Sequence, residues 1–224
     1  NGFRKKYLLF TTDMLIENQH FTLKHFTPEQ IGMKAIEQNV SDIASMGGIP
    51  KYALVSLGLP QDTEIDFVDK LYKGINKKSE NYRIAVVGGN VSKSEEIFVG
   101  VSLIGFVEKG YLALRSGAKK GDLIFCSGKI GGSAVGLELL RHGLRGKSTE
   151  RHLKPQCRLS LARKLVKLGI HSMIDISDGV ASEVRHLCTE SGVGAVIHAN
   201  KLPISKESLF DFKKIKTEKE ITDY

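Results

Sequence analysis

The chain has 224 residues, of which 41% are hydrophobic and 26% are charged, a balance typical of a globular protein with one large or two modest cores. No apolar run approaches the roughly 20 residues needed to cross a bilayer, and the first residues do not resemble a signal peptide. The three cysteines are isolated in the sequence. We therefore expect reduced thiols, a cytoplasmic location and no membrane partner.

The net charge of +8 favours anionic partners, either nucleic acid or phosphorylated small molecules. Lysine and arginine are scattered along the chain, tryptophan is absent, and aromatic residues make up only 7% of the sequence. Base-stacking surfaces of nucleic-acid-binding proteins need more aromatic residues than this. The composition thus favours small phosphorylated molecules and predicts no nucleic-acid partner.

The first predicted strand, residues 7–10, is followed by Thr11, Thr12 and Asp13 before apolar residues resume. Oxygen-bearing side chains inside a hydrophobic segment need polar partners if they are buried. One interpretation is a cluster of metal ligands. The other is that the threonines simply favour a strand and Asp13 marks a bulge.

The next element, residues 27–46, is a predicted helix with Thr27 as N-cap, Pro28 at the first position and Gln30 completing a capping box. Asp42 lies late in this helix, where the helix dipole opposes a negative charge. A bound cation would stabilise a negative charge in that position. We therefore treat Asp42 as a candidate functional residue.

The remainder of the N-terminal half predicts a β-α-β-α-β-β order, with a strand at 53–59, a helix starting at 62–63, and strands at 83–87 and 97–107. The strand at 83–87 leads into Gly88, Gly89 and Asn90. A glycine pair lets backbone amides approach a phosphate closely, although a plain turn explains it equally well.

A domain boundary is predicted near residue 110, which gives an N-terminal α/β domain at 1–110 and a C-terminal α/β domain at 111–224. The second half predicts strands at 123–126, 170–176 and 194–198, and helices after 133, at 159–168 and at 181–191.

Asp175, Ser177, Asp178 and Gly179 fall where the predicted strand 170–176 gives way to a helix. Asp178 could cap that helix, and Gly179 permits a tight turn. Two carboxylates so close together repel each other unless a cation lies between them, and Mg²⁺ prefers such oxygen ligands. The alternative is a helix cap beside a solvated loop acid.

Several of these motifs together resemble the thiamine-monophosphate kinase family. The resemblance rests on Thr11-Thr12-Asp13 with His20-Phe21, on the helix segment from Ile31 to Gly47, on Gly88-Gly89-Asn90, on Arg115-Ser116-Gly117-Ala118 and on Asp175-Ile176-Ser177-Asp178-Gly179. The wider superfamily includes aminoimidazole ribonucleotide synthase and hydrogenase- and selenium-related members.

This resemblance implies an α+β fold with the two-domain aminoimidazole ribonucleotide synthase-like architecture, with a mixed sheet and helices packed on one face in each domain. It implies an enzyme that transfers the γ-phosphoryl group of ATP directly, in line, to thiamine monophosphate, with several Mg²⁺ ions and as a homodimer. The N-terminal domain would carry the metal and nucleotide side and the dimer contact.

Carried over by position, the resemblance also implies roles for individual residues. The metal ligands would be Thr11, Thr12, Asp13, Asp42, Asp175 and Asp178, with Asp42 and Asp178 the best candidates for a catalytic role through the metal. ATP would face Tyr72, Gly89, Asn90, Arg115 and Ser177, and His20 would line the substrate pocket.

The chain also departs from the family pattern. Asn90 stands where many members have an aspartate, and a neutral amide is a poorer metal ligand. Motifs expected before Thr11 and after Tyr224 are missing, so we expect the C-terminal domain to be incomplete. Two alternatives remain open: another ATP-using member of the superfamily that releases phosphate, in ring closure or dehydration, or a non-enzymatic basic protein that binds nucleic acid.

Overall fold

The structure is a computed structural model and describes residues 5–222. The described chain forms two compact units. The first contains the residues up to Lys119 together with Gln156–Val193, and the second contains Lys120–Pro155 together with the residues from Gly194 on. The segment 156–193 therefore belongs with the N-terminal residues, although it lies far along the sequence from them.

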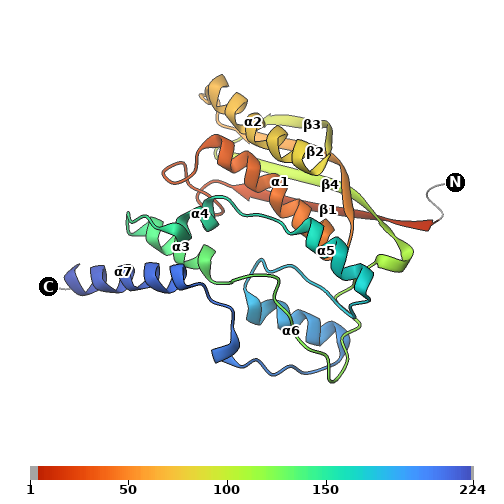
Figure 1. Cartoon of the computed structure of the whole chain (residues 1–224). Coiled ribbons are helices and arrows are strands. Elements are labelled where there is room, and N and C mark those ends of the chain that lie inside the picture. The colour runs from red at the N-terminus through yellow and green to blue at the C-terminus, as the bar shows by residue number, and fades with distance from the viewer. Residues whose placement is uncertain (1–4, 223–224) are drawn as a thin grey trace. The chain divides into compact units, whose positions relative to one another are not determined.

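The first unit is built on a four-stranded mixed sheet with the strand order β1-β4-β2-β3. The strands are β1 (Lys6–Ile16), β2 (Ile49–Leu59), β3 (Ala85–Lys93) and β4 (Phe98–Glu108). β4 runs antiparallel to β1 and to β2, and β2 runs parallel to β3. The helices α1 (Pro28–Ser45) and α2 (Ile65–Tyr82) lie on one face of this sheet (Figure 1). The predicted β-α-β-α-β-β order is confirmed.

Residues of β1 alternate between the helix-covered face and the open face of the sheet. Leu9 and Leu15 are buried on the helix side, whereas Phe10 is 65% exposed on the other. The ladder between β1 and β4 is continuous and pairs Asp13 with Val101. The interpretation of Asp13 as a bulge is therefore wrong, and Asp13 faces the helix side as part of a regular strand.

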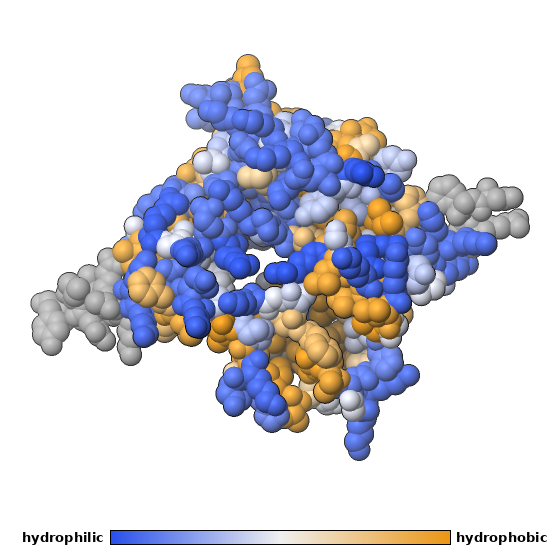
Figure 2. Space-filling model, viewed as in Figure 1, coloured by the Kyte–Doolittle hydropathy of each residue, from blue (hydrophilic) through white to orange (hydrophobic). Residues whose placement is uncertain are grey.

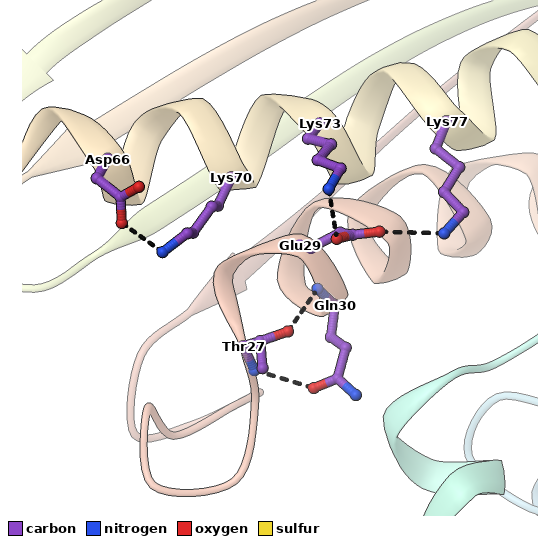
Figure 3. A network of polar contacts seen from close by, with 7 residues as sticks. All are labelled: Thr27, Glu29, Gln30, Asp66, Lys70, Lys73 and Lys77. Carbon is purple, nitrogen blue, oxygen red and sulfur yellow. Dashed lines mark hydrogen bonds and ion pairs between the residues drawn. The ribbon is translucent and has the colours of Figure 1, made fainter.

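The start of α1 agrees with its sequence signature. The Gln30 amide donates to Thr27 Oγ1 at 3.3 Å, and the Thr27 amide donates to Gln30 Oε1 at 2.9 Å (Figure 3). Together with Pro28 at the first position, this capping box fixes the helix start and thus the places of the residues that follow.

The crossing of α1 and α2 is close because each helix has a glycine at the contact. A Cβ on Gly32 would lie 2.1 Å from the Leu71 carbonyl oxygen, and one on Gly74 would lie 2.0 Å from the Glu29 carbonyl oxygen. At the rim of this crossing, Glu29 pairs with Lys73 at 3.7 Å and with Lys77 at 3.1 Å (Figure 3). Both lysines are exposed, so these ion pairs contribute less than about 1 kcal/mol each.

The side of α2 turned to the viewer is covered by hydrophilic residues (Figure 2). This distribution is expected of a helix that packs one side on α1 and β3 and leaves the other to water. The helix ends at Arg83, whose φ of 56° is left-handed, the region that helix C-termini commonly use.

The glycine pair near β3 lies inside the strand rather than after it, which corrects the prediction of a strand ending at Val87. β3 continues to Lys93 alongside β2. A Cβ on Gly89 would lie 1.7 Å from the Val55 carbonyl oxygen of β2. The close approach of two strands therefore explains Gly89 without any ligand.

The first unit also contains α5 (Leu159–Leu165), a short 3-10 turn at Val166–Leu168 and α6 (Val180–Ser191). The second unit contains α3 (Gly132–Arg141), α4 (Lys147–Leu153), a 3-10 turn at Ala199–Lys201 and α7 (Lys206–Thr222). Within the second unit, the buried Asp211 side chain accepts a hydrogen bond from the Ser148 amide at 2.9 Å and thereby caps α4.

The α+β class and the two-part architecture are confirmed, but the strands expected at 123–126, 170–176 and 194–198 do not form in the described chain. Phe125 is 86% exposed and Val196 is 79% exposed, so these apolar segments have no neighbouring strand to bury them. Residues 120–222 contain a single isolated bridge, between Ile130 and Ile204. Without partner strands, strand-forming residues remain irregular.

None of the helices in the described residues is both long enough and apolar enough to span a membrane.

Replacing Gly32 by alanine should destabilise the protein by about 1–3 kcal/mol, because the added methyl group would overlap the Leu71 carbonyl and push the two helices apart. Urea unfolding would measure this change in the free energy of unfolding. Gly110→Ala is the matched control, since a Cβ there has no neighbour within 4 Å. Equal effects of the two substitutions would contradict the proposed close crossing.

Candidate functional site

Four carboxylates from three separate parts of the first unit lie near one another. Asp13 comes from β1, Asp42 from α1, and Asp175 and Asp178 from the segment that leads into α6. Burial raises the pKa of Asp13, and the charges of Asp175 and Asp178 raise it further. The residues that are distant in the sequence therefore interact electrostatically in the fold.

Asp42 is the most perturbed member of this group. Burial raises its pKa to about 6, against the hydrogen bond from Thr11, and the charges of Asp175 and Asp13 raise it as well. Thr11 Oγ1 donates to Asp42 Oδ2 at 2.5 Å, and Arg115 provides a weaker favourable charge. Two nearby negative groups, Asp175 and Asp13, with one peripheral arginine leave Asp42 short of positive charge.

Asp175 is held by the helix that carries Asp42. Ser41 Oγ donates to Asp175 Oδ2 at 2.7 Å, so consecutive residues of α1 contact two different parts of the site. Ser41 is not among the site residues predicted from the sequence. Its partner lies 134 positions away, and no local pattern could have indicated the contact.

Asp178 does not cap α6, which corrects the sequence-based expectation. The N-cap is Gly179, with a φ of 108°, and no side chain caps the helix there. Instead Glu183, a buried residue of the first turn, accepts hydrogen bonds from the Asp178 amide at 3.0 Å and from Ser177 Oγ at 3.3 Å. Sequence reasoning missed Glu183 because it lies one position after N3, the position at which a capping box has its glutamate. The Asp178 side chain is thus left exposed.

His20 lies in the turn that follows β1. Its Nδ1 accepts a hydrogen bond from the Ile16 amide at 3.1 Å, so the proton of the neutral ring lies on Nε2. The imidazole also lowers the pKa of Asp13, against the effect of burial, so it lies close to the carboxylate group. The structure therefore brings His20 to the same site as the four acids.

Arg115 belongs to a segment that pairs with the residues just before Asp175. The Arg115 carbonyl accepts from Ser191 Oγ at 3.1 Å, and the Met173 amide donates to the Leu114 carbonyl at 3.1 Å. These bonds hold the backbone, while the guanidinium is exposed near Asp42 and available to an anion.

Thr12 is not brought to the acids by its side chain. It lies on the open face of the sheet, where its hydroxyl is 3.1 Å from Ser102 Oγ and 3.3 Å from the Val101 carbonyl. Alternation along β1 sends Thr12 to the face opposite Thr11 and Asp13. The sequence alone could not settle which of the two threonines shares a face with the acids.

Tyr72, Gly89 and Asn90 occupy the other side of the first unit, on α2 and β3. β3 and β1 are opposite edges of the sheet, about 14 Å apart at the usual strand spacing. Gly89 nevertheless shares a cross-strand row with Asp13, through Val55 and Val101. A ligand in contact with both groups would have to extend across the full width of the sheet.

The donor set of the site is suited to a hard cation such as Mg²⁺, because it consists of carboxylate and hydroxyl oxygens. Among residues 5–222, no group of three or more His, Cys, Asp or Glu side chains is arranged to hold a metal ion by itself. Mg²⁺ typically takes only one or two carboxylates and completes its octahedron with water and phosphate oxygens. The dispersed acids fit ions that bind together with a phosphorylated ligand.

Comparison with known proteins gives two matching family models. The AIR synthase related protein N-terminal domain matches residues 3–107, and the AIR synthase related protein C-terminal domain matches residues 119–221. The chain is 44% identical over 211 residues to thiamine-monophosphate kinase of Aquifex aeolicus, covering 90% of this chain and 67% of that protein. It is 38% identical over 204 residues to thiamine-monophosphate kinase of Bacillus subtilis, covering 87% and 63% respectively.

A solved structure described as AaThiL complexed with AMPPCP and TMP superposes on the chain with a TM-score of 0.89. The two are 41% identical, and the superposition covers 95% of this chain and 69% of the other. The chain thus spans about two thirds of the length of these relatives.

Replacing Asp42 by asparagine should stabilise the ligand-free, metal-free protein at pH 7.5 by about 1–2 kcal/mol, a value reduced for solvent screening at this half-buried carboxyl. The folded pKa of Asp42 exceeds its unfolded value, so the wild type loses stability as the pH rises from about 4 to about 6. The gain in Asp42→Asn should therefore vanish near pH 4.

Urea unfolding with a metal chelator, repeated between pH 4 and pH 8, would measure this gain. Asp69→Asn, at an exposed position of α2, is the control and should show no such pH-dependent gain. An Asp42→Asn protein that is less stable than the wild type at pH 7.5 would instead make Asp42 a structural residue.

Proposed function

Since the chain belongs to the thiamine-monophosphate kinase family, we propose that it transfers the γ-phosphoryl group of ATP to thiamine monophosphate, giving thiamine diphosphate and ADP. The observation that carries this proposal is the meeting of Asp13, Asp42, Asp175 and Asp178 at one place in the first unit. A group of acids in which Asp13 and Asp42 have raised pKa values, together with an exposed arginine and an oriented histidine, is suited to bringing two phosphate-bearing molecules together.

Asp13, Asp42, Asp175 and Asp178 would hold Mg²⁺, with Thr11 and Ser41 fixing two of the carboxylates through hydrogen bonds. When bound there, Mg²⁺ would neutralise the negative charge of the phosphate oxygens. The raised pKa of Asp42 supports this assignment, because a cation is what would make the charged carboxylate favourable.

The side chains around the acids have separate tasks in this proposal. The Arg115 guanidinium would donate to phosphate oxygens of ATP. His20 would donate from Nε2 to the acceptor, since its Nδ1 is occupied by the Ile16 amide. Ser177, Tyr72, Gly89 and Asn90 remain proposed contacts of ATP. Gly89 and Asn90 lie on the edge strand β3, and Tyr72 lies on α2.

We infer direct in-line transfer, in which an acceptor phosphate oxygen forms a bond to the γ-phosphorus as the bond to the β–γ bridging oxygen breaks. In such a reaction the protein mainly positions two anions and stabilises the developing charge. The residues of the site are oriented by hydrogen bonds to β1, α1 and α6, which supports a positioning role.

We also propose the domain division near residue 110, with the metal and nucleotide side in the first domain, to which Asp175 and Asp178 come from beyond this boundary. The gap between the two family matches, which end at 107 and resume at 119, supports this boundary. Cys126, Cys157 and Cys188 are free thiols, which supports the proposal of a reducing, cytoplasmic location.

We further propose a homodimer formed by the open face of the sheet. Apolar side chains are exposed there on the two strands that flank β4: Leu8, Phe10 and Met14 of β1, and Tyr52 and Leu54 of β2. Phe10 and Tyr52 both pair with Ile104 of β4. A second copy of the same face would bury a contiguous apolar patch of this kind.

The proposed activity is tested with the natural full-length protein, ATP, thiamine monophosphate and Mg²⁺. Thiamine diphosphate should form, and Asp175→Asn should lower kcat/KM by about a hundredfold or more because an oriented carboxylate is lost. Asp69→Asn is the control and should retain wild-type kinetics. Release of inorganic phosphate without thiamine diphosphate would reject the kinase in favour of another ATP-using reaction.

The proposed dimer is tested by Phe10→Asp, which should shift the protein to a monomer in light scattering, because a charge at the centre of an apolar interface is left unpaired. Ile65→Asp, at an exposed apolar position at the start of α2, should leave the oligomeric state unchanged. A Phe10→Asp protein with the mass of the wild type would exclude this face as the interface.

A further inference from the structure

Lys34 of α1 is a half-buried cation that contacts the turn bearing His20. Lys34 Nζ donates to the His20 carbonyl oxygen at 2.7 Å. The same ammonium lies 5.1 Å from the centre of the Phe26 ring. It therefore contacts the turn between β1 and α1 near both ends, at His20 and at Phe26.

The charge of Lys34 is not balanced by a carboxylate. Among the described residues no ion pair involves it, and burial alone lowers its pKa to about 8. Lys78 of α2 shows the usual arrangement for a buried lysine, because it pairs with the buried carboxylate of Glu37. A carbonyl oxygen and an aromatic face stabilise the Lys34 ammonium only in part.

The turn also has contacts of its own beside Lys34. The Asn18 amide donates to the Phe21 carbonyl at 2.8 Å, and Phe21 and Phe26 are both buried, in an edge-to-face pair with centroids 6.5 Å apart. The turn thus has a fixed shape, and Lys34 fixes its carbonyl at His20. Among the residues that the structure describes, the His20 carbonyl is the one hydrogen-bond acceptor of this ammonium, so its other N–H groups can donate to a ligand.

We infer that Lys34 is a positioning and specificity residue for the phosphate-bearing acceptor: it holds the His20 turn in place and supplies the unbalanced positive charge that favours a phosphorylated over an unphosphorylated ligand. This inference rests on the proposed function for the identity of the acceptor. Its physical basis is separate, since a buried cation without a counter-ion gains most from an anion that arrives with the substrate.

The test uses the full-length protein and three variants. Lys34→Gln keeps an N–H donor for the His20 carbonyl and removes the charge, Lys34→Arg keeps the charge, and Lys24→Gln removes an exposed lysine from the same turn as a control. KM for thiamine monophosphate, KM for ATP and kcat are measured for each. Binding of thiamine monophosphate and of thiamine is compared separately by thermal shift, which needs no turnover.

Lys34→Gln should raise KM for thiamine monophosphate by about tenfold or more, as expected for loss of a charge-assisted contact, with kcat and KM for ATP nearly unchanged. Its preference for thiamine monophosphate over thiamine should fall by a similar factor. Lys34→Arg should restore most of that preference, and Lys24→Gln should behave as the wild type.

A Lys34→Gln protein that melts at a lower temperature but keeps the preference for the phosphorylated ligand would overturn the inference and make Lys34 purely structural. An equal rise in KM for ATP would overturn the assignment to the acceptor. If the wild type makes no thiamine diphosphate, the proposed function fails, and the comparison of the two ligands in thermal shift still decides the role of Lys34.

Discussion

Mutual repulsion of carboxylates is the constraint around which the first unit is organised. Burial and the charge of Asp175 raise the pKa values of Asp13 and Asp42, and the charge of Asp13 raises that of Asp42 further. Asp13 and Asp42 are placed by β1 and α1, and Asp175 is held by a hydrogen bond from Ser41 of α1. A fold that only needed stability would disperse these acids or neutralise them, as it does for Glu37 with Lys78 and the Tyr82 hydroxyl. The uncompensated charge therefore identifies the site more directly than any pocket in the surface.

The sequence predicted much of this because several signals were local. The capping box at Thr27, the polar residues inside β1 and the acid late in α1 each conflict with or complete a short-range rule, and the structure keeps all three. The chemistry of the sequence marks Asp13 and Asp42 separately as candidate cation ligands, and the family resemblance implies that they belong to one set of metal ligands. The family resemblance supplied the substrate, which no spacing could indicate.

Other features could not be predicted because they depend on contacts between distant residues. Ser41 with Asp175 and Glu183 with Asp178 form only after folding, so the expectation that Asp178 caps α6 followed a valid local rule and was wrong. The strands predicted for the second half do not form because they lack a partner. Phe125, for example, is of a strand-forming residue type but has no neighbouring strand in the described chain. Local propensity favours a strand, but the strand forms only where a neighbouring strand pairs with it.

The role of α1 follows from helical spacing. Lys34, Glu37 and Ser41 are three and four residues apart and so lie along one side of the helix, about 10 Å from first to last. Lys34 contacts the turn after β1, Glu37 accepts from the Cys157 amide at 2.7 Å, and Ser41 reaches Asp175. One helix thus contacts the turn after β1, the start of the 156–193 segment and Asp175, which this segment carries. A small rotation of α1 would move all three together, so the glycines that set its packing against α2 also set the geometry of the site.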